Sequence, residues 1–384
     1  MPPFAATRRA AYDPGFVPKT EYNGVAPPPA CVTHSPDPGE SVRYGASVEF
    51  RHVSKRFSSQ SSGAAVEDLS LSVPPGAICV LVGPSGCGKT TTLKMVNRLV
   101  EPTDGQVLID GEDVARFDVV ALRRRIGYVI QHVGLFPHQT IADNVATVPR
   151  LLGWPRERIA HRVDELLDLV GLEPDQFRRR YPAQLSGGQR QRVGVARALA
   201  AEPPLMLMDE PFGAVDPIVR ERLQDEFLRL QRRLGTTVLF VTHDIDEAIK
   251  LGDRVAVMQE GGHLAQYSPP AELLMHPAND YVARFVGGDR TLKRLALMRV
   301  ADVPLEPPVA GLEPTCAPGA TVREALSSLL ATPAGRLLVV DDGAGRPLGT
   351  LTLAAIGSAL RSIATASTPD RAEAPRRQTD GGAP

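Results

Sequence analysis

The chain has 384 residues, of which 43% are hydrophobic and 23% charged, and its formal net charge is -1. This length suggests two or three domains and allows a large core without disulfides. The near-neutral balance excludes a global basic field of the kind that binds nucleic acid, and a strongly acidic chain that is disordered throughout. The four cysteines lie far apart without a CxxC pair, which fits a reducing compartment better than a disulfide framework.

Both ends have the composition of solvated segments. Residues 1–45 hold nine of the 35 prolines and little apolar periodicity, so we expect a disordered arm there. Arg8 and Arg9 are not followed by an apolar run, so no signal peptide is expected. Residues 363–384 are again low in core-forming side chains and are predicted to form a disordered tail. No run of 18 apolar residues occurs, so we expect no membrane span in the chain itself.

A phosphate-binding motif is the first signal of chemistry. The apolar run AICVLV at 77–82 is typical of a buried parallel strand, and GPSGCGKT at 83–90 leads from it into TTLKMVNRLV at 91–100, which is predicted to be a helix. This is the order that G-x-x-x-x-G-K-[ST] requires, with glycines around phosphate oxygens, a lysine on the outer phosphates and a hydroxyl for Mg²⁺. The alternative, a glycine-rich turn with a surface lysine, is disfavoured by this context. The predicted nucleotide-binding residues are Gly83, Pro84, Ser85, Gly86, Cys87, Gly88, Lys89, Thr90 and Thr91.

Two further apolar runs end in polar side chains. LMLMDEP at 205–211 places Asp209 to hold a magnesium shell and Glu210 to orient or deprotonate an attacking water. TTVLFVTHD at 236–244 leads to His243, which can contact a terminal phosphate. Two alternatives stay open at this point. An Asp-Glu pair often caps the next helix, and a histidine at a strand end is often a satisfied polar residue.

The alternation of these runs with helical stretches such as 218–235 predicts an α/β fold with a mainly parallel sheet. Ligands of such sheets bind beyond the carboxyl ends of the strands, which is where all three motifs fall. The stretch LSGGQRQRVGVARALA at 185–200 combines a Ser-Gly-Gly turn with a helix. Its uncovered N–H groups favour an anion. Its apolar stripe is predicted to consist of Val193, Ala196, Leu199 and Ala200.

With these residues the chain resembles the ATP-binding cassette family over about 48–289, and LSGGQ at 185–189 looks like the family signature. The resemblance implies a P-loop NTPase fold: a RecA-like core, an antiparallel β subdomain and a helical subdomain that carries the signature. It also implies an ATP hydrolase that uses ATP and Mg²⁺. In the family, the signature of one copy closes over the ATP of the other, so a dimer of two copies is expected. The residues implied to act in trans are Leu185, Ser186, Gly187, Gly188 and Gln189.

Matching positions carry further roles by the same resemblance. Phe57 resembles the aromatic that stacks on adenine, with a buried core phenylalanine as the alternative. Gln131 resembles the glutamine that joins Thr90 and Asp209 in the magnesium shell. Asp216 resembles the residue that couples the two sites across the dimer. The implied catalytic set is Glu210, His243 and Gln131.

The resemblance also implies partners and a cargo. A transport role requires separate integral-membrane permease subunits, with an extracytoplasmic solute-binding protein reached through them, and a place at the cytoplasmic face of the plasma (inner) membrane. No nucleic-acid partner is expected. Residues 276–300 resemble the exit segment of quaternary-amine importers, which take up glycine betaine, choline or carnitine. An importer of an amino acid, polyamine or inorganic anion, or a non-transport ABC ATPase, are the alternatives.

A second region is expected after the cassette at 46–289. Residues 321–362 predict a helix, an apolar strand, a glycine-containing turn, a short strand and a helix. This pattern resembles one cystathionine-beta-synthase-type repeat, a small α/β region that we place at 290–362. Sensing of nucleotide or ionic strength and a role restricted to dimerisation are both left open.

Overall fold

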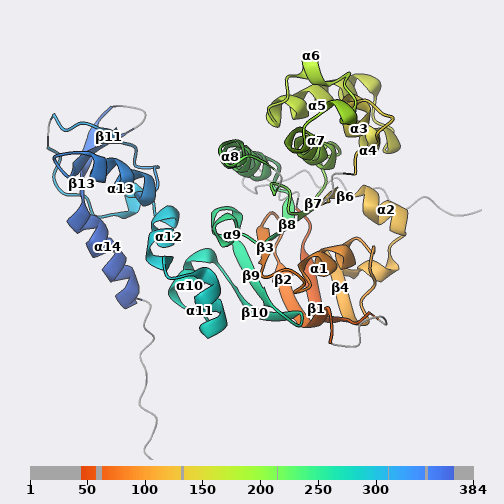
Figure 1. Cartoon of the computed structure of the whole chain (residues 1–384), viewed down its shortest axis with the longest axis horizontal. Helices are drawn as coiled ribbons and strands as arrows, with labels where there is room; N and C mark the ends of the chain where they lie inside the picture. The colour runs from red at the N-terminus through yellow and green to blue at the C-terminus, as the bar shows by residue number, and fades with distance from the viewer. Residues whose placement is uncertain are drawn as a thin grey trace, which may run out of the picture. The chain divides into compact units, whose positions relative to one another are not determined.

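The computed structural model describes residues 45–57, 63–130, 134–213, 215–309, 311–341 and 345–366 (Figure 1). The predictions for the N-terminal arm, the C-terminal tail and Gln131 therefore lie outside the described residues, save for the few positions at the inner edges of the two terminal segments. Within the described ranges, no helix combines the length and the apolar character needed to cross a membrane.

A six-stranded sheet forms the centre of the cassette. Its strands, in spatial order, are β10 (His263–Ser268), β9 (Arg254–Gln259), β3 (Ile78–Val82), β8 (Thr237–Thr242), β7 (Leu205–Asp209) and β6 (Ile126–Val129). All neighbouring pairs are parallel except β9 with β10. Every residue of β3, β7 and β8 is buried, as expected for strands covered on both faces. The predicted mainly parallel sheet is confirmed.

Alternate residues of β3 enter two different hydrophobic cores, one on each face of this sheet. Ile78, Val80 and Val82 belong to a core that includes the helices α5 (Arg156–Leu169), α7 (Gly187–Leu199), α8 (Pro217–Leu234) and α9 (Ile245–Leu251). Cys79 and Leu81 belong to a core shared with α1 (Lys89–Val96). The two-residue period of a strand thus sets which helix covers which face.

A second, antiparallel sheet packs on the α1 side. It consists of β2 (Val66–Val73), β1 (Val48–Lys55), β4 (Asp104–Ile109) and β5 (Glu112–Asp113). The inward-facing side chains of β1 and β2, such as Phe50 and Leu69, are buried in the α1 core. Two short helices follow, η1 (Val114–Arg116) and α2 (Val119–Arg124). The antiparallel subdomain is therefore present as predicted.

The signature helix α7 lies in a helical group that Figure 1 shows gathered on one side of the sheets. The other members are α3 (Ile141–Val145), α4 (Thr147–Leu151), α5, α6 (Pro174–Phe177) and η2 (Pro182–Gln184). α7 packs against α3, α5 and strand β6. The predicted apolar stripe of Val193, Ala196, Leu199 and Ala200 is buried throughout, which confirms it.

The helix predicted directly after the phosphate loop is shorter than the sequence suggested. α1 ends at Val96, and Arg98 adopts a left-handed φ of 53°. The N–H groups of Leu99 and Val100 both donate to the carbonyl of Lys94, which closes the helix end. An apolar pattern that continues past a helix end cannot reveal this stop.

The chain continues through three helices into a small separate core. These helices are α10 (Pro270–Met275), α11 (Asp280–Val286) and α12 (Arg290–Leu297). The remaining elements are η3 (Val300–Asp302), β11 (Thr315–Cys316), α13 (Val322–Ala331), β12 (Arg336–Val340), β13 (Pro347–Thr352) and α14 (Leu353–Ala366). The predicted order helix, strand, strand, helix is confirmed for α13 to α14. The resemblance to a cystathionine-beta-synthase-type repeat stays a prediction.

Two phenylalanines offer a matched test of the central core. Phe240 on β8 is fully buried, whereas Phe136 is 40% exposed. We expect Phe240→Ala to lower the free energy of unfolding by about 3–5 kcal/mol, because it leaves a cavity between sheet and helices. Phe136→Ala should change it by less than about 0.5 kcal/mol. Urea unfolding of both variants measures this difference, and equal losses would contradict the described core.

Candidate active site

The phosphate loop connects β3 to α1 and depends on glycines where other backbone comes close. A Cβ on Gly88 would collide with the carbonyl oxygen of Ala65, and one on Gly83 with the carbonyl oxygen of Met258. Gly88 also has a left-handed φ of 94°. Ser85 is exposed at the loop tip. The base of the loop is therefore fixed against β9 and against the residue that precedes β2.

Lys89 is buried, and its side chain turns back into the loop. Its ammonium donates to the carbonyl oxygens of Gly83 and Pro84, both at 2.8 Å, and lies 3.6 Å from the Cys87 sulfur. An ammonium prefers an ionised phosphate oxygen over a neutral carbonyl as its acceptor. A phosphate bound in the loop would therefore attract the lysine away from these neutral partners.

Thr90 and Asp209 meet although 119 positions separate them in the chain. The Thr90 hydroxyl donates to Asp209 Oδ1 at 3.0 Å. Burial raises the pKa of the Asp209 carboxyl and the nearby Glu210 charge raises it further, while the Thr90 hydrogen bond acts in the opposite direction. A bound cation would relieve the cost of this buried charge.

These two groups fit Mg²⁺. Both present hard oxygen ligands, and Mg²⁺ in nucleotide sites is held by one or two protein groups together with substrate phosphates. Within the part of the chain that the structure describes, no cluster of three or more His, Cys, Asp or Glu side chains is arranged to hold a metal alone. The third predicted ligand, Gln131, lies outside the described residues.

Glu210 and His243 form a second pair at the same sheet edge. His243 Nδ1 lies 3.0 Å from Glu210 Oε1, and the Glu210 N–H donates to the Val241 carbonyl at 3.0 Å. Glu210 has a left-handed φ of 48°, a conformation that costs about 1–2 kcal/mol per residue. This backbone turn brings the carboxylate to the imidazole at the end of the adjacent strand. Capping of α8 falls instead to Asp216, so the helix-cap alternative for the Asp-Glu pair is wrong.

The signature turn is exposed and begins α7 with a reciprocal cap. The Ser186 hydroxyl accepts from the Gln189 N–H at 3.2 Å, and Gln189 Oε1 accepts from the Ser186 N–H at 2.9 Å. Leu185 is buried, while Ser186 and Gly187 are exposed and Gly188 is partly so. Figure 1 shows α7 within the helical group.

One contact between the signature helix and Glu210 was not predicted from the sequence. Gln191 is buried on α7, and its amide donates to the Glu210 carbonyl at 3.5 Å. The available signal was a polar residue one turn before Val195 on a buried helix face, a position that usually carries an apolar side chain.

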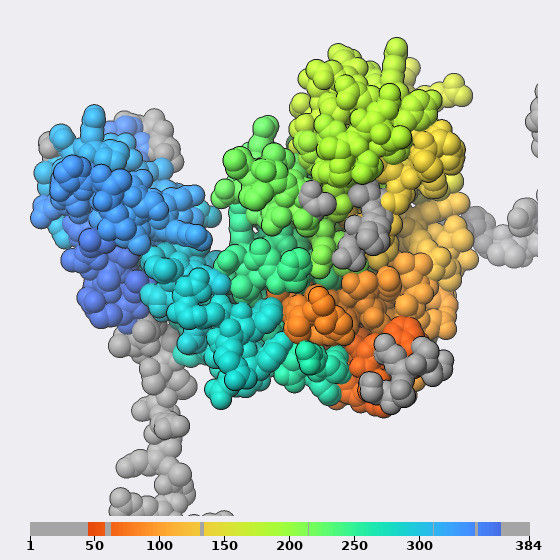
Figure 2. Space-filling model, viewed as in Figure 1, coloured from red at the N-terminus to blue at the C-terminus, as the bar shows by residue number. Residues whose placement is uncertain are grey.

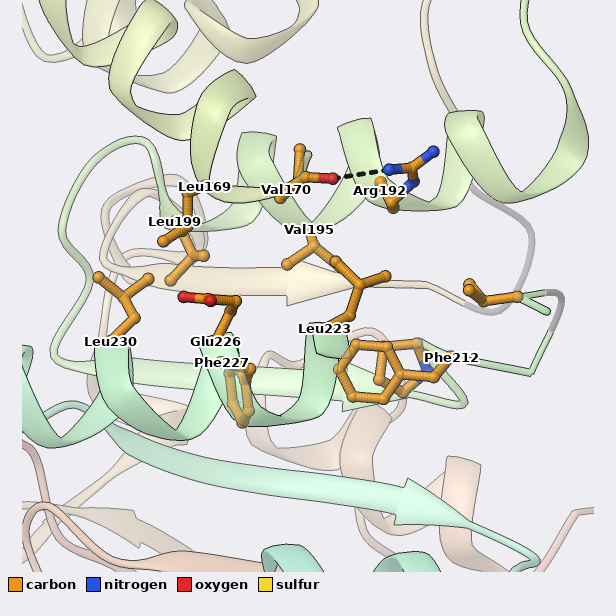
Figure 3. A pocket seen from close by; sticks show the side chains of 12 residues that line it. Leu169, Val170, Arg192, Val195, Leu199, Phe212, Leu223, Glu226, Phe227 and Leu230 are labelled. Carbon is orange, nitrogen blue, oxygen red and sulfur yellow. Dashed lines mark hydrogen bonds between the residues drawn. The ribbon is translucent and has the colours of Figure 1, made fainter. Parts of the chain in front are cut away.

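A small apolar cavity of about 20 Å³ lies between α7, α8 and the segment after Glu210 (Figure 3). Phe212, Val195 and Leu223 line it, and Arg192 at its edge donates to the Val170 carbonyl at 2.9 Å. This volume suits about one water molecule, but the walls offer it few polar partners. The helical group is therefore less tightly packed against α8 here than an ideal interior would be.

The remaining predicted residues lie apart from these pairs. Phe57 is half-buried after β1, with the Lys55 ammonium 5.1 Å from its ring centroid, and it belongs to none of the described cores. Asp216 is exposed at the start of α8, where its carboxylate accepts from the Ile218 N–H at 3.0 Å. Thr91 follows Thr90 in the first turn of α1. Their roles at the adenine and across a dimer stay predictions.

The chain is similar to a known protein family and to several characterised proteins. The ABC transporter family model matches residues 66–213. The osmoprotectant import ATP-binding protein OsmV of Salmonella typhimurium is 53% identical over 285 residues, 74% of this chain and 73% of that protein. The glycine betaine/carnitine/choline transport ATP-binding protein OpuCA of Bacillus subtilis is 50% identical over 278 residues, 72% of this chain and 71% of that protein.

Among solved structures, a dimeric ATP-binding cassette in a post-hydrolysis state, bound to ADP and Pi, is similar with a TM-score of 0.53. It is 33% identical, and the match covers 58% of this chain and 98% of that one. The fold, the phosphate loop and the two side-chain pairs together define a P-loop ATPase. The chain belongs to the ABC transporter family, and its predicted assignment as a transport ATPase is confirmed.

The buried carboxyl of Asp209 makes stability depend on pH when nucleotide and metal are absent. Because its pKa is raised by folding, folding of the wild type weakens as pH rises from the ordinary aspartate range through the raised value. Asp209→Asn should therefore be more stable than wild type at neutral pH, with the advantage vanishing at low pH, where both side chains are neutral.

Urea unfolding in a chelating buffer across this pH range measures the effect. Asp104→Asn, at an exposed carboxylate on β4, is the matched control and should show no such trend. An Asp209→Asn variant that is less stable than wild type at neutral pH would show that burial does not dominate this carboxyl.

Proposed function

We propose that the protein is the ATP-hydrolysing subunit of an importer for quaternary-amine osmoprotectants such as glycine betaine, carnitine and choline. One geometric observation carries the ATPase part: the Thr90–Asp209 and Glu210–His243 pairs lie at one sheet edge, next to the phosphate loop. The cargo rests on two relatives at about half identity, whose names specify osmoprotectant import and glycine betaine/carnitine/choline transport.

The proposed site holds ATP by its phosphates. The backbone amides of 83–88 surround the phosphate oxygens, and the Lys89 ammonium leaves its two carbonyl partners for the outer phosphates. Thr90 and Asp209 would hold Mg²⁺, with Gln131 as the further predicted ligand. When bound, the ion would offset the negative charge of the phosphates during transfer.

Glu210 and His243 have different roles at the terminal phosphate. The Glu210 carboxylate orients a water molecule, whose oxygen bonds to the terminal phosphorus as the bond from that phosphorus to the ADP oxygen breaks. The carboxylate takes the proton that the water loses. His243, 63% exposed at its side chain and 3.0 Å from Glu210, would contact the terminal phosphate. Hydrolysis then yields ADP and phosphate.

The second half of each site comes from another copy of the chain. Ser186 and Gly187 are exposed at the start of α7, where the hydroxyl still has a proton to donate and the helix end is positive. Asp216 is also exposed, and so is Ile218 two positions on, with 83% of its surface accessible, as expected for a surface that a partner covers. The similar solved cassette is described as dimeric, which supports this arrangement.

Permease subunits are the proposed membrane partners. Exposed apolar side chains on and next to the helical group, Phe136, Leu151 and Leu152, offer a docking surface. Beside Phe136, a groove of about 250 Å³ is lined by Arg123, Tyr128 and other residues of α2, β6 and α7. We place the protein at the cytoplasmic face of the plasma (inner) membrane, held there by these permeases. An extracytoplasmic solute-binding protein would deliver the solute to the permeases.

Glu210→Gln tests the catalytic assignment and the cargo together. The variant should still bind ATP, but its turnover should fall at least about 100-fold, because the amide cannot accept the proton. Cells that lack this gene should recover uptake of labelled glycine betaine, choline or carnitine at high osmolarity with wild type, and not with Glu210→Gln. Glu272→Gln, at an exposed carboxylate on α10, is the matched control and should behave as wild type.

Two outcomes overturn different parts of the proposal. Wild-type turnover in Glu210→Gln would remove Glu210 from the catalytic set. If wild type hydrolyses ATP but restores uptake of none of the three solutes, the ATPase stands and the quaternary-amine cargo is wrong.

A further inference from the structure

Side chains of helix α12 contact two hydrophobic cores, the small C-terminal core and the main core of the cassette. Its Leu295 is 3% exposed inside the small C-terminal core, together with Val300 and Val322. Its Leu297, two positions on, packs against the main core of the cassette. The side chains of α12 therefore contact the C-terminal core on one side and the main core of the cassette on the other.

Main-chain hydrogen bonds fix the end of α12 to the C-terminal region. The Val322 N–H donates to the Met298 carbonyl at 2.9 Å, and the Val300 N–H donates to the Ala320 carbonyl at 2.9 Å. The Arg299 guanidinium adds a bond to the Gly319 carbonyl at 2.9 Å. These bonds make α12 and the start of α13 one rigid unit.

Lys293 connects this unit to the cassette. It is buried on α12, and its ammonium donates to the Val286 carbonyl at the end of α11 at 3.0 Å. The same ammonium lies 3.2 Å from Asp246 on α9 and 3.4 Å from Asp289. The ammonium therefore has one carbonyl acceptor and two carboxylate ion-pair partners, on α11, on α9 and at the start of α12. A lysine is rarely buried unless it is paired in this way.

The α9 contact leads directly to the catalytic pair. Asp246 lies in the first turn of α9, which the Asp244 carboxylate caps by accepting from the N–H of Asp246 at 2.9 Å. The Asp244 N–H in turn donates to the Thr242 hydroxyl at 3.0 Å. His243 lies between Thr242 and Asp244, so a shift of the first turn of α9 would also shift the backbone that carries the His243 ring.

The α11 contact leads to the base of the phosphate loop. The Tyr281 hydroxyl on α11 donates to the Met258 carbonyl at 3.1 Å. That carbonyl is the group that leaves Gly83 no room for a Cβ. Lys293 thus contacts the helix that supports the loop and the helix that follows His243.

Away from α12, a hollow lies between the cassette and the C-terminal region. A groove of about 1030 Å³ opens between α8 and α13, with Gln224 and Asp225 on one side and Arg323 and Ser327 on the other. Figure 2 shows this hollow between the green and blue parts of the surface. Lys293 lies on its lining, where α12 bridges it. Helix α12 therefore contacts both the C-terminal region, through α13, and the cassette, through α9 and α10.

We propose that Lys293 is a positioning residue for ATP hydrolysis. Through Asp246 it holds the first turn of α9, and so His243, in register with Glu210. It also transmits displacement of the C-terminal region to that pair. This inference rests on the proposed ATPase roles of Glu210 and His243.

Steady-state ATPase kinetics of the purified full-length chain test the inference. Lys293→Met should lower kcat by about three- to tenfold and leave the KM for ATP within about twofold. The variant loses the Asp246 contact that positions His243 but keeps the Tyr281–Met258 bond that supports the phosphate loop. Lys293→Arg, which keeps a cation on a long stem, should recover most of the loss. Lys250→Met is the matched control: this lysine of α9 pairs with Asp225 at 2.8 Å, and its removal should leave kcat unchanged.

A double-mutant cycle separates positioning from a merely structural effect. In a His243→Ala background, where the ring is absent, Lys293→Met should lower the single-turnover rate by less than about twofold. An equal fold loss in both backgrounds, a rise in KM alone, or an unchanged kcat would each overturn the inference. If wild type itself hydrolyses no ATP, the proposed function fails before Lys293 is tested.

Discussion

The register of three parallel strands is the constraint on which the site depends. β8 pairs on one side with β3, which aligns Val82 with Thr242, and on the other with β7, which aligns Asp209 with Val241. The three strands therefore end at one level, and the residues that follow them must meet there. Thr90, Glu210 and His243 come together for this reason, although local sequence does not connect them. A shift of one position in either pairing would turn the last strand side chains to the other face.

Buried charges and a strained backbone lie together at this edge of the sheet, and a bound nucleotide with its cation would stabilise the charges. Lys89 is buried among uncharged partners, burial raises the pKa of Asp209, and Glu210 has a left-handed backbone conformation. Each feature costs folding free energy in the chain alone, since charges and strained backbone are disfavoured inside proteins. A phosphate chain with its cation supplies partners for both charges. Binding and stability are thus expected to be linked at this edge.

Sequence reasoning predicted what depends on local pattern and on spacing along the chain. The phosphate loop, the carboxylates after β7 and His243 after β8 were found because buried strands read as apolar runs and ligands bind past their ends. The end of α1 at Val96 was missed, because a left-handed Arg98 leaves no mark in an apolar pattern. Gln191 and Lys293 were also missed. Their partners lie on other elements, so only the folded chain shows why polar groups are buried there.

The central claim is that each ATPase site is shared between two copies, with the phosphate loop from one and the signature from the other. Mixed dimers test it most directly. A chain with Lys89→Ala is paired with a chain with Ser186→Arg, and separately a chain carrying both changes is paired with wild type. If the signature acts in trans, the first dimer keeps one intact site and about half the wild-type ATPase rate, and the second keeps none. The reverse result, with activity only in the second dimer, would contradict the account.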